Sequence, residues 1–244
     1  MLHTRAAEIV SKLDPKARVL DVGGGIAPLG RADYVLDFLT YDQYASHYKA
    51  VGEGPERFNR TRWIQFDICD RRRWPFDDGF FDYVVCSHVL EDVRDPIWVC
   101  AEIARVARAG YIETPSRIVE QSKGVEHPCY AGYYHHRWLV SAERGCVVFR
   151  FKPHSLHALA SAIVARVGPF RKINPVYENF CFEWKDRLDF REQLEFSEAK
   201  VNEELAAFAA KARETPDLTV PTHIVPLTKL KYFVYFLRLR LGLR

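Results

Sequence analysis

Apolar and polar positions along the first half of the chain follow two different periods. Short apolar runs bounded by Gly, Pro, Asp or other charged residues are typical of buried strands. Between these runs, apolar residues recur every three or four positions, as they do on one face of an amphipathic helix. The pattern predicts strands near residues 17–22, 33–37, 62–66, 81–86 and 109–113, and helices near 4–13, 41–50 and 95–107.

Strands that alternate with helices favour an α/β fold with a doubly wound, mostly parallel, Rossmann-like sheet. Two later runs, 147–151 and 180–184, alternate like strands. We expect them to complete a seven-stranded sheet as its antiparallel closing pair. Residues 155–167 read as a helix between them, and 191–213 read as a charged amphipathic helix. Residues 119–140 lack a clear period and are expected to form loops over the carboxyl edge of the sheet.

Composition fits one domain with elaborations and gives no sign of a nucleic-acid partner. The 244 residues are 48% hydrophobic and carry a net charge of +3, a balance too even to favour nucleic acid. The six cysteines form no C-x-x-C pair, as in a reduced cytosolic protein. No apolar signal region opens the sequence and no apolar run reaches 18 residues, so we expect a cytoplasmic protein.

A glycine-rich loop follows the first predicted strand. Residues 18–25 read RVLDVGGG, and Asp37 closes the next apolar run. Glycines let the backbone approach a ligand because they have no Cβ. A carboxylate at the end of the second strand can accept hydrogen bonds from a ribose diol. Together these features indicate a cofactor that carries a nucleoside, bound across the carboxyl ends of two adjacent parallel strands.

A dinucleotide is the rival cofactor for this loop. Its fingerprint is G-x-G-x-x-G, with the pyrophosphate on the N-terminus of a helix. Here the loop reads GGGIAPLG, so Pro28 stands in place of the third glycine, and Asp33 follows Gly25 by only eight residues. This spacing leaves little room for a long helix. A nicotinamide oxidoreductase stays an alternative, as does a glycine-rich turn that binds no ligand.

Five ordered blocks, over roughly residues 15–118, resemble class I S-adenosylmethionine-dependent methyltransferases. They are VLDVGGG at 19–25, Asp37, WIQFDI at 63–68, WPFDDGFFDYVVCSHVLE at 74–91, and AEIARV with AGYIETPS between 101 and 116. The resemblance implies S-adenosylmethionine as the cofactor, with its methionine part over the glycines, its ribose on Asp37 and its adenine amine on Asp67. The implied contacts are Asp21, Gly23, Gly24, Gly25, Asp37, Asp67 and Ile68, with Ser87 and His88 nearby.

Methyl transfer to a hydroxyl needs a general base near the acceptor. The cofactor brings the methyl group, so the protein must align the acceptor and take up its proton, and histidine is the usual base. His136 opens an HRW element, at 136–138, that resembles one in bacterial methyltransferases linked to polysaccharide and cell-surface glycan genes. His136 or His135 is the expected base, His88 is the second candidate, and Glu113 is expected to orient a base or to accept from a sugar hydroxyl. These residues would alternatively serve only to hold their loops by hydrogen bonds.

Side chains that bind divalent ions also occur in this region, but without a recognised spacing. Mg²⁺ prefers carboxylates and water, whereas histidine suits transition metals. Mg²⁺ is therefore compatible with the sequence without being indicated by it, and no residue is assigned to a metal. The side chains of these types are Glu126, His127, His135 and His136 with Asp67 or Glu113.

The sequence thus predicts an O-methyltransferase that methylates a hydroxyl of a saccharide, such as an oligo- or polysaccharide precursor or a glycolipid. The aromatic residues among the histidines suit sugar rings, and they suit a phenolic natural product nearly as well. A non-catalytic, cofactor-binding regulatory protein is a further alternative. Nucleic-acid methylation is disfavoured because CSHV at 86–89 stands where an Asn/Asp-Pro-Pro-Tyr type element is expected.

The expected domain organisation is a methyltransferase domain over 1–190, with an acceptor-side loop at 114–140, and a helical extension over 191–244. The tail at 227–244 mixes aromatic and apolar residues with five cations, as in a basic amphipathic helix that lies on an anionic membrane. The alternative for the tail is a helix docked on its own domain or on a second subunit, as in a homo-oligomer.

Overall fold

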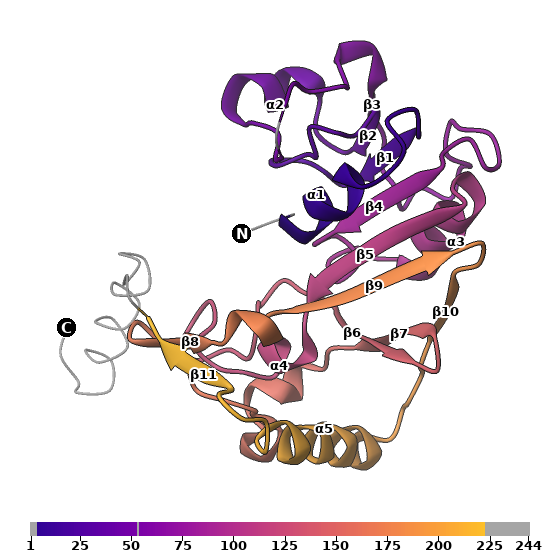
Figure 1. Ribbon diagram of the computed structural model, residues 1–244. Coiled ribbons are helices and arrows are strands. Elements are labelled where there is room, and N and C mark those ends of the chain that lie inside the picture. Colours follow the sequence, from indigo (N-terminus) through magenta and orange to yellow (C-terminus); the bar gives the residue numbers. More distant parts are fainter. Residues whose placement is uncertain (1–3, 53, 223–244) are drawn as a thin grey trace. The chain divides into compact units, whose positions relative to one another are not determined.

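The chain forms two compact units in the computed structural model, which describes residues 4–52 and 54–222 (Figure 1). The first unit comprises the residues up to Thr114, Ala142–Val148 and Cys181–Glu192. The second comprises Pro115–Ser141, Phe149–Phe180 and the residues from Gln193 on. The tail helix expected at 227–244 lies outside the described residues.

Six strands form the main sheet, in the order β3-β2-β1-β4-β5-β9. They are β1 (Val19–Val22), β2 (Tyr34–Asp37), β3 (Trp63–Gln65), β4 (Tyr83–Ser87), β5 (Ala109–Pro115) and β9 (Asn179–Lys185). The pairs β1–β2, β2–β3, β1–β4 and β4–β5 are parallel. The strand order changes direction at β1, so the carboxyl ends of β1 and β4 flank the switch point at which open α/β sheets bind ligands.

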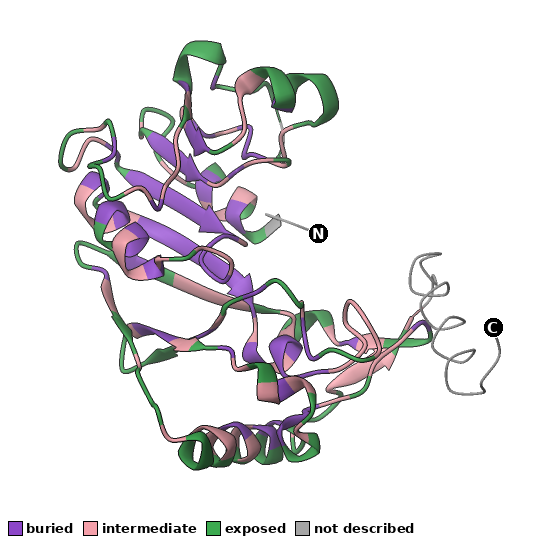
Figure 2. Cartoon of the chain, turned by 180° about the vertical axis from the view of Figure 1, so that it is seen from behind, coloured by how far each residue is buried: buried purple, intermediate pink, exposed green. Residues whose placement is uncertain are grey.

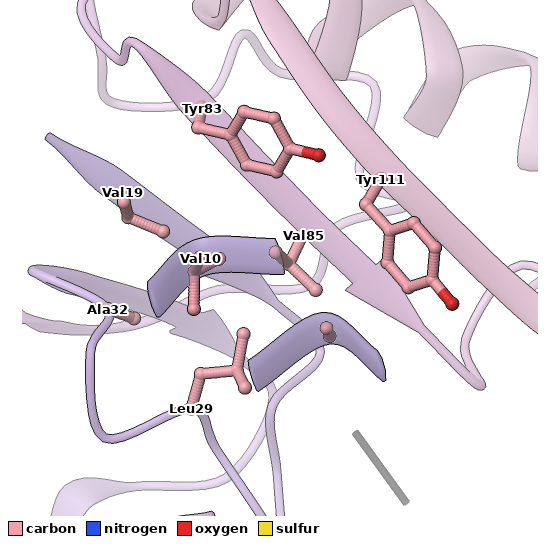
Figure 3. Close-up of a cluster of buried hydrophobic side chains, with 8 residues drawn as sticks. Val10, Val19, Leu29, Ala32, Tyr83, Val85 and Tyr111 are labelled. Atoms are coloured by element: carbon pink, nitrogen blue, oxygen red, sulfur yellow. The ribbon is translucent and has the colours of Figure 1, made fainter. Parts of the chain in front are cut away.

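The core of the first unit lies against both faces of this sheet. β1 and β4 are buried along their whole length (Figure 2), which explains why they read as apolar runs. On one face, Val10 of α1 (Thr4–Ser11) packs in a cluster with Val19 and Val85 (Figure 3).

The opposite face is covered by α3 (Pro96–Val106). The side chain of Asp95 caps this helix by accepting from the N–H of Trp98 at 3.0 Å, and proline occupies the first turn, as the Asp-Pro pair predicts. Successive side chains of a strand point to opposite faces. Cys86 of β4 therefore points away from α1, and it interacts electrostatically with Cys100 of α3.

At the edge of the main sheet, α2 (Tyr41–His47) packs on β3. The helix begins with a capping box between Thr40 and Gln43. Its Tyr44 stacks on Trp63, with 4.8 Å between ring centroids. A 3₁₀ helix, η1 (Arg60–Arg62), leads into β3.

Short elements and one longer helix make up the second unit. They are α4 (Arg117–Glu120), η2 (His154–His157), η3 (Ala160–Ala162), β8 (Arg171–Ile173), η4 (Pro175–Tyr177), α5 (Glu198–Ala212) and β11 (Thr219–Pro221). β8 and β11 pair antiparallel. Leu205 of α5 is buried in a cluster with Leu139 and Leu156.

A three-stranded sheet has the order β10-β7-β6. Its strands are β6 (Trp138–Glu143), β7 (Cys146–Phe151) and β10 (Asp189–Glu192), and β6 and β7 each contribute residues to both units. Among all described residues, no helix combines the length and apolar character that crossing a bilayer requires.

The expected count of seven strands is wrong for the described residues, among which the main sheet has six strands. The run at 180–184 joins it as β9, but the run at 147–151 forms β7 of the smaller sheet. Between β6 and β7, Arg144 and Gly145 have φ of +50° and +79°, as in the two-residue turns that favour hairpins. Pairing between neighbours in sequence closes a short loop at small entropic cost, so β7 pairs with β6.

The helix expected over 155–167 is also wrong, since only η2 and η3 form there. The backbone N–H groups of Val164 and Val167 donate to the carbonyls of Gln121 and Lys123, at 2.8 Å each. These bonds replace the i→i−4 bonds that a helix would make at Val164 and Val167, so the chain is extended over this part of the segment. Similarly, the helix expected from 191 begins only at Glu198, and the helical character of the extension over 191–244 is not confirmed, because its described part also holds β11 and the end of β10.

Candidate functional site

The glycine-rich loop turns the chain at the carboxyl end of β1. Gly23 and Gly25 have φ of +71° and +44°, a region that other residues rarely adopt. A Cβ at Gly23 would overlap with the side chain of Val89, and one at Gly24 would lie 2.7 Å from Oδ2 of Asp21. The loop therefore needs glycine for its conformation and for its close approach to the end of β4.

Asp37 ends β2 and ties the glycine loop to that strand. Its Oδ2 accepts from the N–H of Gly25 at 2.9 Å, and its Oδ1 accepts from the N–H of Leu39 at 2.7 Å. Burial raises the pKa of this carboxyl, and these backbone bonds oppose the rise. An ionised carboxylate has about four acceptor positions, so Asp37 can still accept from the hydroxyls of a ribose.

Two buried oxygens beside the loop have no hydrogen-bond partner among the described residues. One is Oδ1 of Asp21, whose Oδ2 accepts from the N–H of Leu29 at 2.7 Å. The other is Oγ of Ser87, at the end of β4. Burial raises the pKa of Asp21 to about 7, with a smaller contribution from the charge of Asp37. Unpaired buried polar atoms are uncommon in proteins, and here they lie where polar groups of a ligand are expected.

Asp67 and Ile68 lie in the turn after β3. The N–H of Phe66 donates to the carbonyl of Asp37 at 2.8 Å, which brings this turn to the same edge of the sheet. Asp67 is partly exposed and pairs with Arg94 at 3.0 Å. The carbonyl of Ile68 accepts from Nε1 of Trp74 at 3.2 Å. The side chain of Asp67 therefore stays accessible at the edge where the resemblance implies the adenine.

His88 follows β4 and lies between two buried carboxylates. Its backbone is left-handed, with φ of +56°. Nε2 lies 3.1 Å from Oε1 of Glu113, and Nδ1 lies 3.6 Å from Oε1 of Glu91. Burial opposes a charge on the ring, but the two carboxylates outweigh it and raise the pKa of His88 to about 9. Since both nitrogens face acceptors, the ring is held as an imidazolium cation at neutral pH.

Glu113 has hydrogen-bond partners besides His88. Its other oxygen accepts from the hydroxyl of Tyr111, and the same hydroxyl lies 3.1 Å from Sγ of Cys181 in β9. Burial, with Cys181 and Glu113, raises the pKa of Tyr111, so this hydroxyl keeps its proton and can donate. Glu113 is thus fixed by partners on β4, β5 and β9.

Four carboxylates are buried at this edge of the sheet. Asp21, Asp37, Glu91 and Glu113 are each at most 7% exposed, and His88 lies 3.1 Å from Glu113 and 3.6 Å from Glu91. Burial raises the pKa of the Cys86 thiol, and the charges of both Glu91 and Asp21 add to the rise. The charges of these carboxylates therefore influence the other titratable groups at this edge.

The second unit contains the two neighbouring histidines of the predicted acceptor-side segment. His135 is exposed, whereas His136 is buried and its Nδ1 lies 2.8 Å from Oε1 of Glu120. The ring of His136 also packs against that of Tyr133, with 4.6 Å between centroids. Lys152 donates to the other oxygen of Glu120 at 2.5 Å. The sequence gives no way to tell these two histidines apart, whereas in the structure they differ in burial and in contacts.

Two of the side chains considered as metal ligands instead hold this segment. Oε2 of Glu126 accepts from the N–H of Tyr134 at 3.1 Å, and Nδ1 of His127 accepts from the N–H of Cys129 at 3.2 Å. These bonds hold the loop locally. The dependence on a metal stays an untested prediction.

The sequence did not reveal three residues that contact the candidate histidines or their partners: Glu91, Glu120 and Lys152. Glu120 lies 16 residues from His136 and 32 from Lys152, and neither separation matches a helix or strand period. Glu91 closes the VLE of the fourth block, so its distance of three residues from His88 was the one available signal.

Comparison with known families finds a match for part of the first unit. Residues 20–112 match the family model of a methyltransferase domain. The match contains the glycine loop, Asp37, Asp67 and His88, and it covers less than half of the chain. No curated protein sequence matches this chain.

Several solved structures resemble parts of the chain at low identity. An S-adenosylmethionine-dependent methyltransferase from Mesorhizobium loti is 15% identical, with a TM-score of 0.35, over 66% of this chain and 71% of its own. An arsenic(III) S-adenosylmethionine methyltransferase from Chlamydomonas reinhardtii is 20% identical, with a TM-score of 0.30, over 46% and 48%. A chain from the complex of the Haloferax volcanii Trm112 methyltransferase activator with a methyltransferase is 21% identical, with a TM-score of 0.34, over 46% and 51%. The chain spans about half the length of the first structures it matches, and at these TM-scores the likeness says nothing about function.

Proposed function

We propose that this chain transfers a methyl group from S-adenosylmethionine to a hydroxyl of a saccharide, and the match of residues 20–112 to the methyltransferase domain model supports the proposal. The observation that carries the cofactor is the buried Oδ1 of Asp21 beside the glycine loop, which has no hydrogen-bond partner among the described residues. Buried charge is costly unless it is paired, so this edge favours a ligand with a positive charge. The sulfonium of S-adenosylmethionine is such a group, whereas the pyrophosphate of a dinucleotide is an anion.

The residues at the edge also fit the nucleoside of this cofactor. We expect Asp37 to accept from the ribose and Asp67 to accept from the adenine amine. Ile26, in the glycine loop, and Phe38, next to Asp37, are 52% and 73% exposed, and they offer apolar surface to the adenosine. When bound, the cofactor supplies an electrophilic methyl group. The residues of the first unit bind and orient it and provide negative charge beside it.

For the acceptor, we propose His136 as the general base and not His88. The contacts of His88 with two carboxylates hold its ring in the protonated form. His136 contacts a carboxylate through Nδ1, as the base does in nucleophilic triads. His136 takes the hydroxyl proton as the acceptor oxygen bonds the methyl carbon and the carbon–sulfur bond breaks. The products are a methyl ether and S-adenosylhomocysteine.

A saccharide acceptor is supported by aromatic side chains close to this histidine in the second unit. Tyr130 and Tyr134 are 41% and 67% exposed, with ring centroids 6.4 Å apart. The ring of Tyr134 lies 5.2 Å from that of His135. Exposed aromatic faces with polar tips suit sugar rings. A phenol would stack on them as well, and it would need less help from a base.

Label transfer tests the proposal. The protein is incubated with methyl-labelled S-adenosylmethionine and a panel of sugars, glycolipids, phenols and amines, and we expect label in a sugar or glycolipid. Label only in phenols or amines would overturn the saccharide acceptor while leaving the cofactor assignment intact. Calorimetric titration with S-adenosylhomocysteine and with NAD tests the cofactor separately, and binding of NAD alone would overturn it.

A further inference from the structure

His157, the last residue of η2 in the second unit, has one ring nitrogen fixed by the backbone and one that faces solvent. The N–H of Ala131 donates to its Nδ1 at 3.1 Å. A ring nitrogen that accepts a hydrogen bond carries no proton, so the proton of the neutral imidazole is on Nε2. Nε2 has no hydrogen-bond partner among the described residues, and it does not belong to the buried side-chain atoms that lack one. This N–H is therefore a hydrogen-bond donor that a ligand can reach.

The surroundings of the ring keep it neutral and are positive overall. Burial lowers the pKa of His157, and the charges of Lys152, His154 and Lys123 lower it further, while Glu120 acts in the opposite direction. Glu120 is already balanced by Lys152, whose Nζ donates to it at 2.5 Å. Lys123 forms no ion pair with another described residue. Since the uncompensated charge is positive, this donor favours an anionic acceptor over a neutral one.

Exposed aromatic rings lie beside the donor. Tyr130 is 41% exposed, and its ring centroid lies 5.4 Å from that of His157 in an edge-on arrangement. Tyr134 is 67% exposed, with its centroid 6.4 Å from that of Tyr130. Lys123 belongs to the same surface, because its backbone forms an antiparallel bridge with Ala131, the residue that fixes His157. An aromatic face with a polar donor at its edge suits a sugar ring that carries a polar substituent.

We propose that Tyr130, His157 and Lys123 form a subsite for an anionic group of the saccharide acceptor, either a carboxylate or a phosphate. The inference rests on the proposed function, in which the acceptor is a saccharide, and it narrows that class to acidic sugars. Tyr130 packs on the sugar ring, the Nε2–H of His157 donates to an anionic oxygen, and Lys123 supplies the opposite charge. Hydrogen bonds to ionised oxygens are roughly twice as strong as those between neutral groups, so the subsite discriminates between acidic and neutral sugars.

Binding of matched glycosides tests the subsite without methyl transfer. The full-length protein, saturated with S-adenosylhomocysteine, is titrated by NMR with methyl glucoside, methyl glucuronoside and methyl glucoside 6-phosphate, which differ only at carbon 6. We expect at least one acidic glycoside to bind about tenfold more tightly than the neutral one at low salt, and the difference to shrink as salt is added. The better of the two acidic glycosides identifies carboxylate or phosphate as the preferred group. Equal affinity for all three, or binding of none, would overturn the inference.

Substitutions assign the preference to these side chains. His157→Phe keeps a ring but removes the donor, and Lys123→Met removes the charge, so each should weaken binding of the acidic glycoside by about tenfold and leave the neutral one unchanged. His157→Gln should stay within about threefold of wild type, because its amide can accept from Ala131 and donate in turn. Lys200→Met is the control for charge, since Lys200 is an exposed lysine that pairs with Glu195, and it should bind like wild type.

Two outcomes of the substitutions decide the matter. Wild-type affinity of Lys123→Met for the acidic glycoside would refute the subsite, even if His157→Phe does not fold. Label transfer keeps this failure distinct from failure of the proposed function. Label in neutral sugars but not in acidic ones would refute only the subsite, whereas label only in phenols or amines would refute the saccharide acceptor itself.

Histidine NMR tests the donor directly. With ¹⁵N-labelled protein at neutral pH, and the His157 signals assigned from their loss in His157→Gln, we expect a neutral ring protonated on Nε2. Addition of the acidic glycoside should shift the Nε2 signal more than an equal concentration of the neutral glycoside does. A free protein in which the ring is protonated on Nδ1 would contradict the inference, because its Nε2 could then only accept.

Discussion

His88 and His136 both contact buried glutamates, but those glutamates have different neighbours. His88 has a carboxylate oxygen beside each nitrogen, so it gains from carrying both protons. The glutamate at His136 is on Nδ1 and is shared with a lysine. The sequence analysis listed both residues as candidate bases, because the sequence around a histidine does not show which side chains contact its ring. For both histidines, the glutamate within hydrogen-bond distance is distant in sequence, by 25 residues for His88 and 16 for His136.

The stability of the protein should therefore fall at alkaline pH because of His88. Its pKa is about 9 in the folded protein against 6.5 for an unperturbed histidine. The stabilisation is complete below pH 6.5 and disappears as the pH rises through 9, and a shift of this size corresponds to roughly 3 kcal/mol. Urea unfolding of wild type and His88→Gln should show a difference in unfolding free energy at pH 6 that shrinks by pH 9.5. A difference that stays constant over this range would contradict the assigned charge.

Glu91 offers a test of the charge argument for the cofactor. S-adenosylmethionine carries a sulfonium cation and S-adenosylhomocysteine does not. We expect Glu91→Gln to weaken binding of the first more than the second, by roughly 1–2 kcal/mol, as for unit charges that interact through a partly buried site. Calorimetric Kd values for both ligands give the comparison. Asp77→Asn, which alters an exposed carboxylate, should leave the ratio unchanged, and equal weakening of both ligands by Glu91→Gln would refute the electrostatic role.

Elements were predictable where their signal is local. The strands β1 to β5 and the helices α1 to α3 lie close to the predicted ranges, because each has its own apolar period and its own capping or turn residues. The sheet to which β7 belongs depends on a pairing partner, and an alternating run carries no information about that partner. The helix predicted after Pro153 was wrong for a related reason. Its apolar spacing fits a helix, yet its backbone bonds go to residues 121–123.

Gln121 is the residue that makes this extended segment stable. It is fully buried, and its Nε2 donates to the carbonyls of Ala162 and Leu205 at 2.8 and 3.0 Å. Gln121→Leu removes both bonds and takes this donor away from the Ala162 carbonyl, so we expect a loss of roughly 1–3 kcal/mol in unfolding free energy. Glu203→Leu, at an exposed position of α5, should change it by less than about 0.5 kcal/mol. Similar denaturation curves for wild type and Gln121→Leu would show that these bonds do not hold the segment.

At the scale of the whole molecule, cofactor residues and the proposed base differ in how they could be found. Gly23, Gly25 and Asp37 were recognisable because a turn and two strand ends within fifteen residues define them. Glu120, His136 and Lys152 are brought together by the fold of the second unit, and no contiguous motif joins them. The sequence therefore predicts individual cofactor-binding residues, but it predicts the base only as one of two neighbouring histidines.

This division leads to a prediction that compares the two histidines. His135 is exposed, whereas His136 is buried against Glu120. His136→Ala should lower turnover of the labelled sugar by roughly 10²–10⁴-fold, the range for loss of a general base, while His135→Ala keeps most of the activity. Both variants should bind S-adenosylhomocysteine like wild type, because the residues implied to bind the cofactor belong to the first unit. Equal turnover in the two variants would return the role to a carboxylate or to His88, and loss of cofactor binding in His136→Ala would show that its effect on turnover does not report on the base.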